Sequence, residues 1–461
     1  MMKNTNKVIA LALSVLCCGS MSACFGGGNN GGGNANELSF FVRNTVNEIA
    51  TINQMTTAFK EKIKSEEGKD ITIKIKTLSD ATYNRDMLNA ISSRDLPDVI
   101  YITDEYLENW AMKGTLENLD PYFAQSNFDF TKHDEAAFDI SKCVGRSNET
   151  HLYMVPRTYD QPLFALNVDL WHELMGDDVA IPTADETWTW SKLMGIFESL
   201  RSAMDEKYPK DSATYMPLDA QIGWQAFYEP FIRSFGGYVY ETETESIGMS
   251  SPGTRKAVEK LKGMLDSKYV PPVSTGSYFL GEKAVMFLIS RPYVTDWTEN
   301  NIDNVAFLPI PIYDSSFTGV ENGTSYYSYG SVGFAMNSGS SNKDLAYKYL
   351  EFTLSEEGQL IWSKSGLAVP TLLSMQQQED AAWKKPYSFL DGVDQSAFTF
   401  VDYKKDCYTR IQATYARTGN IDRTYESAFY DEVTAIFNTL STKSLDSFIG
   451  TAQDQLVRFI G

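Results

Sequence analysis

The stretch LPDVIYITDEYLENWAMKG, residues 96–114, changes its periodicity halfway along. Residues 96–103 form an apolar run behind a proline, which is typical of a strand buried on both faces. From Asp104 the apolar residues recur at helical spacing, and Gly114 is the kind of residue at which helices end. The stretch therefore predicts a buried strand that leads directly into a helix.

Two similar units precede this one. Residues 37–43 (ELSFFVR) are rich in strand formers, and residues 46–64 carry apolar side chains on one helical face. Residues 70–80 (DITIKIKTLSD) alternate between apolar and polar, as a half-buried strand does, and residues 83–92 again have helical spacing. Three strands alternating with three helices predict an α/β fold with a mostly parallel sheet.

Polar residues follow each of these strands. They are Arg43 with Asn44, then Asp80, then Thr103 with Asp104. In open α/β sheets ligands bind outside the carboxyl ends of the strands, so these residues predict a polar pocket. Each also has a structural alternative, and Asp104 in particular is well placed to cap the helix that follows.

The second half has the same elements in a less regular order. Residues 151–176 contain strand-like runs interrupted at Pro156, and Thr183–Glu186 has the pattern of a capping box. Residues 282–294 (EKAVMFLISRPYV) predict a buried strand that ends in polar and aromatic residues, and residues 304–311 predict another strand stopped by prolines.

The amino-terminal residues predict export. Two lysines precede an apolar run of eleven residues, 8–18, which is too short to span a bilayer and suits a signal peptide, residues 1–23. Residues 21–24, Met-Ser-Ala-Cys, resemble the lipobox of bacterial lipoproteins, with methionine in place of the usual leucine. The resemblance implies cleavage before Cys24 and a diacylglycerol anchor on its thiol; the alternative is an ordinary secretory signal with a chance cysteine.

A flexible tether follows the cysteine. Residues 25–36 are mostly glycine and asparagine, which bury no apolar surface. Such a coil has a root-mean-square reach on the order of 20 Å. Together with Cys24, residues 24–36 are expected to hold a folded body near a membrane.

Composition limits the remaining possibilities. Without its signal the chain keeps about 440 of its 461 residues, which suits two domains, and its formal charge moves from −20 to −22. This acidity argues against nucleic acid, or an anionic membrane face, as a partner. Cys143 and Cys407 remain after Cys24, and their spacing leaves open whether they are bonded.

The order of the segments resembles the sugar-type (family 1) extracellular solute-binding proteins, relatives of the maltose-binding protein that serve ABC importers. The resemblance covers residues 38–370. It is carried by segments no one of which is decisive alone: LPDVIYI…GTLENLDPYF, YMVPRTYDQPLFALNVDLW, ETWTWSKLM, FIRSFGGYVY, FLGEKAVMFLISRPYV, VAFLPIP and GFAMNSGSSNKDLAYKYLEFTLSEEGQLIWSKSG.

The resemblance implies a two-lobed, periplasmic-binding-protein-like fold of type II, with two parallel or mixed sheets flanked by helices. The chain would cross between the lobes near residues 156–159, 308–311 and 366–370. The implied lobes are residues 37–155 with 313–367, and residues 160–312 with 368–461.

The resemblance also implies ligand contacts. From the first lobe these are Asn44 and Asp104, beside Asp80 from the strand-end analysis, and Arg157 lies just after the first crossing. In the second lobe the implied stacking residues are Trp224, Phe227, Tyr228 and Tyr293. Arg291 departs from the family by replacing a glycine, which would favour an acidic sugar unless the arginine pairs with a carboxylate elsewhere.

These residue types suit a carbohydrate. One face of a pyranose is a patch of C–H groups that fits an aromatic ring, and its hydroxyls pair with carboxylates, amides and arginines. The expected protein binds a carbohydrate, with an oligosaccharide as the expected form, at the outer surface of the cell membrane and delivers it to ABC permease subunits by closure of the lobes. Membrane contact would be through the lipid alone, and no cofactor or metal is expected.

Two alternatives are less favoured. One is a binding protein for a non-sugar solute such as a peptide or a polyamine. The other is a surface glycoside hydrolase, which would need two carboxylates across a sugar bond. The sequence has three histidines without HExxH spacing and lacks GxSxG, GxGxxG, CxxC and phosphate-loop motifs. The expected protein is therefore not an enzyme.

Overall fold

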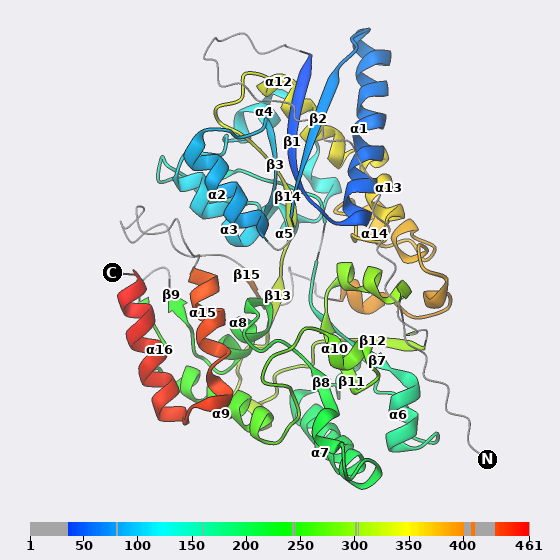
Figure 1. The fold of residues 1–461 in the computed structure, drawn as a ribbon, viewed down its shortest axis with the longest axis vertical. Helices are drawn as coiled ribbons and strands as arrows, with labels where there is room; N and C mark the ends of the chain where they lie inside the picture. The colour runs from blue at the N-terminus through cyan, green and yellow to red at the C-terminus, as the bar shows by residue number, and fades with distance from the viewer. Residues whose placement is uncertain are drawn as a thin grey trace, which may run out of the picture. The chain divides into compact units, whose positions relative to one another are not determined.

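A five-stranded mixed sheet organises the first part of the fold (Figure 1). The computed structural model describes residues 36–460, except 80–81, 159, 242–243, 245, 300–301, 303, 401–406 and 411–428. The sheet has the order β2-β1-β3-β14-β6, in which β1 is parallel to β2 and β3 while β14 is antiparallel to β3 and β6. Its strands are β1 (Glu37–Arg43), β2 (Thr72–Leu78), β3 (Val99–Thr103), β6 (Val155–Pro156) and β14 (Val332–Met336).

Helices lie on both sides of this sheet. In Figure 1 the helices α1 and α13 lie to one side of the strands, and α2 and α3 lie to the other. The sequence-based prediction of three strand–helix units is confirmed, and α1 ends at Gly68, which adopts a left-handed φ of 68°. The helices are α1 (Val46–Glu67), α2 (Tyr83–Ser93), α3 (Asp104–Met112), α12 (Lys343–Leu354) and α13 (Glu356–Lys364).

A four-stranded sheet organises the second part, in the order β12-β7-β11-β8. Strand β11 is parallel to β8 and antiparallel to β7, and β12 is also antiparallel to β7. The strands are β7 (Leu163–Asn167), β8 (Met216–Asp219), β11 (Ala284–Ile289) and β12 (Val305–Pro309). The helices packed with them include α6 (Val168–Met175), α7 (Trp190–Lys207), α8 (Gln225–Ser234), α9 (Pro252–Asp266), α15 (Phe429–Phe437) and α16 (Leu445–Ile460).

Successive side chains of a strand point to opposite faces of its sheet, and strand β7 is buried on both faces. Phe164 and Leu166 belong to the core on one face of the second sheet, whereas Leu163 and Ala165 belong to the core on the other. The first sheet has a separate core, to which β1, β3 and β14 all contribute. Among the described residues no helix is long and apolar enough to cross a membrane.

One predicted boundary needs correction. Residues 313–331 were expected with the first lobe, but Tyr313 and Phe317 pack in the core of the second sheet. Strand β13 (Tyr326–Tyr329) pairs with β15 (Cys407–Arg410), and the hydroxyl of Ser328 donates to the carbonyl of Ala226 in α8. The chain therefore joins the first sheet at β14, about twenty residues later than the predicted crossing at 308–311.

Candidate functional site

The registers of the two sheets place the carboxyl ends of several strands at the edges where the chain crosses between them. In the first sheet Val332 is opposite Thr103, so β14 begins where β3 ends. In the second sheet Leu163 is opposite both Ile289 and Pro309, so β7 begins where β11 and β12 end. Candidate ligand residues are therefore those that follow β1 and β3 on one side, and β8 and β11 on the other.

Asn44 is the exposed residue that follows β1. Its backbone N–H donates to the carbonyl of Leu78 at 2.7 Å, which fixes the main chain while the side chain lies at the surface. Beside it, Arg43 donates from Nη1 to the hydroxyl of Tyr101 at 3.3 Å, with its guanidinium 5.4 Å from that ring. Asp80, predicted at the end of β2, lies outside the described residues.

The side chain of Asp104 is buried and forms a hydrogen bond inside the protein. It is the first residue of α3, is 4% exposed, and accepts the backbone N–H of Ser331 at 3.0 Å. The Ser331 hydroxyl donates in turn to the carbonyl of Thr158 at 2.7 Å. Asp104 thus joins the end of β3 to two crossing segments, a use the sequence analysis did not foresee.

Arg157 also has its contacts inside the protein. Its Nη1 donates to Glu48 of α1, and both side chains are buried. The guanidinium lies 4.5 Å from the ring of Trp362 and 5.6 Å from that of Tyr101. This packing anchors the first crossing segment to the first sheet and gives Arg157 a structural role.

Trp224 lies on the loop that follows β8, with its side chain half-buried. Helix α15 fixes this loop: Thr434 donates from Oγ1 to the carbonyl of Gly223 at 2.9 Å, and Gln221 donates from Nε2 to Asn438 just after the helix at 2.7 Å. A Cβ atom at Gly223 would meet the Thr434 carbonyl at 3.2 Å. A side chain at position 223 would therefore make a tight contact with α15, and the two hydrogen bonds to α15 and Asn438 fix the main chain just before Trp224.

Tyr228, one turn further along α8, belongs to the core. Its ring stacks on Phe437 of α15 with centroids 4.7 Å apart and an angle of 6° between the planes, and it is 1% exposed. In Figure 1 helix α15 (red) lies beside α8 (green). Tyr228 therefore packs between α8 and α15. A side chain buried to this extent has no ring face available to stack on a ligand.

Arg291, the departure from the family pattern, is fully buried. It donates to the carbonyls of Gly366 at 3.2 Å and Trp383 at 2.6 Å, and to Oε1 of Gln395 at 2.9 Å. Burial lowers the pKa of its guanidinium to about 10. Arg291 thus connects the end of β11 to the third crossing segment through hydrogen bonds. Because its donors are used inside the protein, the sequence-based suggestion that Arg291 recognises an acidic sugar loses its support.

Tyr293 follows two residues later and is 44% exposed. It lies in a 3₁₀ segment, Arg291–Glu299, and its ring meets Phe287 of β11 edge to face at 5.8 Å. Tyr293, which is exposed, and Trp224, which is half-buried, are thus aromatic residues that follow adjacent strands at their carboxyl ends.

Two further residues emerge only from the structure. The hydroxyl of Tyr106 in α3 donates to Oδ2 of Asp431 in α15 at 3.4 Å. This contact links the helix that follows β3 to the helix that holds the Trp224 loop. Extending the strand-end rule by one helical turn would have found Tyr106, whereas nothing in the local pattern marks Asp431.

Asp160, at the first crossing, is expected to make the stability of the fold depend on pH. Its Oδ1 accepts the backbone N–H of Arg291 at 3.4 Å, and burial raises the pKa of its carboxyl from 3.8 to about 7, with Arg157 and the hydrogen bonds of Ser290 and Arg291 opposing the rise. A raised pKa means that the folded state binds the proton more tightly. Stability conferred by this group is therefore greatest near pH 4 and is lost as the pH rises to about 7.

We expect Asp160→Asn to remove that part of the pH dependence. The difference in unfolding free energy between variant and wild type should change between about pH 4 and 7, in favour of the variant at the higher pH. Urea unfolding at a series of pH values measures it. Curves that stay parallel over this range would show that Asp160 titrates normally.

The chain is similar to known proteins both in sequence and in fold. Residues 47–360, more than half of the chain, match the family model for bacterial extracellular solute-binding proteins. An ABC substrate-binding protein of Listeria monocytogenes, solved in complex with cycloalternan, is 16% identical with a TM-score of 0.69; the match covers 92% of this chain and 99% of that one.

Two other solved structures are similar. The GacH receptor of Streptomyces glaucescens, solved unliganded and with acarbose, is 17% identical with a TM-score of 0.67, covering 92% of this chain and 98% of that one. The sugar-binding protein MalE of Xanthomonas citri is 16% identical with a TM-score of 0.67, covering 92% and 97%. These likenesses confirm the predicted two-lobed α/β fold with mixed sheets flanked by helices, and by its family match the chain belongs to the bacterial extracellular solute-binding proteins.

Proposed function

We propose that this protein is a lipid-anchored receptor that captures a neutral oligosaccharide outside the cell and delivers it to an ABC importer. The observation that carries the proposal is the pair Trp224 and Tyr293 beyond the carboxyl ends of β8 and β11, the first half-buried and the second 44% exposed. Aromatic faces there suit the C–H face of a pyranose. The similar proteins solved with cycloalternan and acarbose lend support.

Polar groups complete the proposed site. Asn44 would contribute an amide from the first lobe, and Tyr106 and Asp431 would contribute a hydroxyl and a carboxylate. A hydroxyl of a sugar both donates and accepts, so it can pair with all three. The buried position of Arg291 leaves that residue no part in binding, and for that reason we favour a neutral sugar over an acidic one.

The mechanism would be closure of the lobes on the ligand. A sugar that touches residues of both lobes binds the closed form more tightly than the open form, and that difference in affinity sets the population of each. The crossing segments around Asp160, Gly330 and Gly366 would take up the rotation. The permease would then select the closed form, and the sugar would leave unchanged.

Titration calorimetry tests this function. We expect saturable binding of a neutral oligosaccharide, weaker binding of the matching uronic-acid oligomer, and no heat from a peptide or polyamine panel. Sugar recovered after incubation should have its original length. Binding of a peptide or a polyamine instead would replace the proposed ligand class, and shortened sugar would favour a hydrolase.

The lipid anchor is the second part of the proposal. Cys24 and the signal before it lie outside the described residues, so the basis is the Met-Ser-Ala-Cys motif behind an eleven-residue apolar run. We expect Cys24→Ser to move the protein from the membrane fraction to the medium or the soluble fraction, because two acyl chains give stable anchoring and none gives no anchoring. Membrane association that is unchanged in Cys24→Ser, with no ester-linked fatty acid released from the wild type by alkaline hydrolysis, would exclude lipidation.

A further inference from the structure

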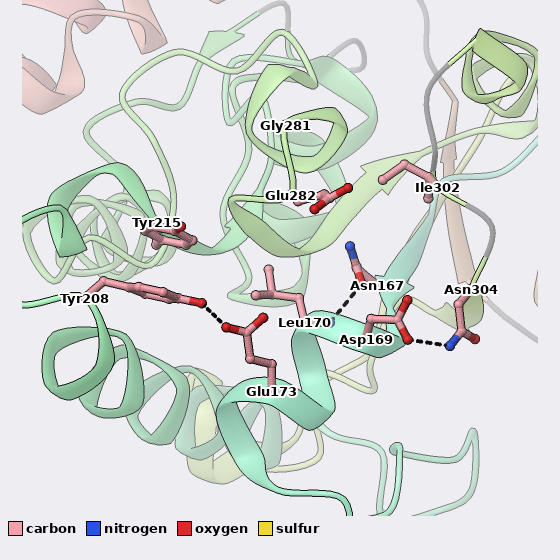
Figure 2. Close-up of a pocket in the computed structure, with 10 residues that line it drawn as sticks. All are labelled: Asn167, Asp169, Leu170, Glu173, Tyr208, Tyr215, Gly281, Glu282, Ile302 and Asn304. Carbon is pink, nitrogen blue, oxygen red and sulfur yellow. Dashed lines mark hydrogen bonds between the residues drawn. The ribbon is translucent and has the colours of Figure 1, made fainter. Parts of the chain in front are cut away.

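A separate cavity of about 390 Å³ lies at the other edge of the second sheet (Figure 2). Asn167 at the end of β7 and Glu282 just before β11 both line it, and Asn167 pairs with Val305 at the start of β12. This edge is opposite the one where β11 and β12 end and the chain crosses to the first sheet. The cavity is therefore distinct from the proposed oligosaccharide site.

One wall is a rigid aromatic pair. Tyr208 and Tyr215 stack with centroids 4.0 Å apart and an angle of 8° between the rings. The Tyr208 hydroxyl donates to Glu173 at 2.5 Å, and Nζ of Lys207 lies 3.0 Å from the same carboxylate oxygen. Burial and the Glu173 carboxylate raise the pKa of Tyr208, which keeps its hydroxyl protonated. Tyr208 and Lys207 thus hold the Glu173 carboxylate in place, and Lys207 balances its negative charge.

The floor presents a hydrogen-bond donor of fixed orientation. Oδ1 of Asn167 accepts the backbone N–H of Leu170 at 2.9 Å and so caps α6. This bond turns the amide nitrogen away from the helix, and Figure 2 shows that nitrogen pointing toward Glu282. Asn167 is 7% exposed, and no described residue accepts a hydrogen bond from its Nδ2. This nitrogen is not among the buried polar atoms without a partner in the described part of the chain, so it is open to the cavity, where water or a ligand acceptor can bind it.

Two carboxylates flank this donor. Asp169 accepts Nδ2 of Asn304 at 2.7 Å through one oxygen, and its other oxygen takes no part in that bond (Figure 2). Neither Asp169 nor Glu282 forms an ion pair with a described lysine or arginine. Within the described ranges no cluster of three acidic, histidine or cysteine side chains is arranged to hold a metal ion. The lining therefore offers carboxylate acceptors together with amide and hydroxyl donors to an organic ligand.

We propose that this cavity binds a small neutral polyol of monosaccharide size. A hydroxyl group accepts a hydrogen bond and donates one, which matches an amide N–H placed between carboxylate oxygens. The stacked tyrosines and the Leu170 side chain supply an apolar wall, and the volume falls within the range of small-molecule sites. The unpaired carboxylates disfavour an anionic ligand, since like charges repel. This second site does not depend on the oligosaccharide function.

Fluorine NMR of 2-deoxy-2-fluoro-glucose with the purified mature protein tests the proposal. We expect line broadening that saturates in the millimolar range. The double variant Asp169→Ala with Glu282→Ala should weaken this binding about tenfold or more, since it removes the charged acceptors. The matched control, Asp177→Ala with Asp178→Ala, removes two exposed carboxylates from the nearby loop and should bind within about twofold of wild type.

Two further samples separate this site from the first. Trp224→Ala should retain the broadening, because Trp224 lies at the other edge of the sheet. The fluorinated glucuronate should bind about tenfold more weakly than the neutral sugar to the wild type, and that preference should shrink in the Asp169/Glu282 variant. Binding that is absent from the wild type, lost in Trp224→Ala, or unchanged in the Asp169/Glu282 variant would overturn the proposal.

Discussion

Replacing Trp224 with alanine is expected to weaken binding of the oligosaccharide by about 10- to 100-fold. The estimate corresponds to about 1.5–3 kcal/mol for burial of one large aromatic side chain. Gln221, Gly223 and α15 hold the loop in place, so the indole is oriented before the ligand arrives and little ordering cost opposes the contact. Titration calorimetry measures the change.

Tyr122→Ala is the matched control for Trp224→Ala. Tyr122 is also a half-buried aromatic residue; its ring stacks on Tyr347 of α12 at 5.2 Å, away from the strand ends of the proposed site. Its loss should leave the affinity for sugar within about twofold of wild type. Equal affinity in wild type and Trp224→Ala, with the control unchanged, would remove Trp224 from the binding site.

Replacing Arg291 with methionine is expected to lower the free energy of unfolding by about 3–5 kcal/mol. Methionine fills much of the same volume but leaves the carbonyls of Gly366 and Trp383 and the amide of Gln395 without their buried donor. Leaving buried polar groups unsatisfied costs about 1–3 kcal/mol for each. Lysine at this position would keep a charge but could not reach three acceptors in a planar arrangement, so Arg291→Lys should also lose stability.

Urea unfolding of the sugar-free protein measures this effect. Arg85→Met serves as the control, because the Arg85 side chain is 71% exposed and its nearest carboxylate, that of Asp86, is 3.8 Å away. Its change should stay within about 0.5 kcal/mol. If Arg291→Met costs no more than Arg85→Met, the buried network does not stabilise the fold. If it instead abolishes binding of an acidic sugar without loss of stability, Arg291 is a ligand residue after all.

Local sequence patterns predicted much of this fold. The change of periodicity at Asp104 matches the junction of β3 and α3, and the alternation after Asp70 matches β2. These elements follow from the spacing of apolar side chains within a few residues, which a sequence displays directly. The ordered set of segments pointed to the family that the comparison then confirmed.

The failures all concern contacts between residues far apart in the chain. Arg291 is buried by Trp383 and Gln395, about a hundred residues later, and Tyr228 by Phe437, about two hundred residues later. The boundary near residue 312 was misplaced because β13 pairs with β15, whose short run of residues carries no strong strand signal. Polar and aromatic residue types alone cannot distinguish a ligand contact from such internal packing.

Small-angle scattering of the mature protein, with and without a saturating neutral oligosaccharide, tests the central claim most directly. Closure of the two lobes predicts a smaller radius of gyration in the bound state, with sugar of unchanged length recovered from the sample. An unchanged radius at saturation, or recovery of shortened sugar, would contradict it.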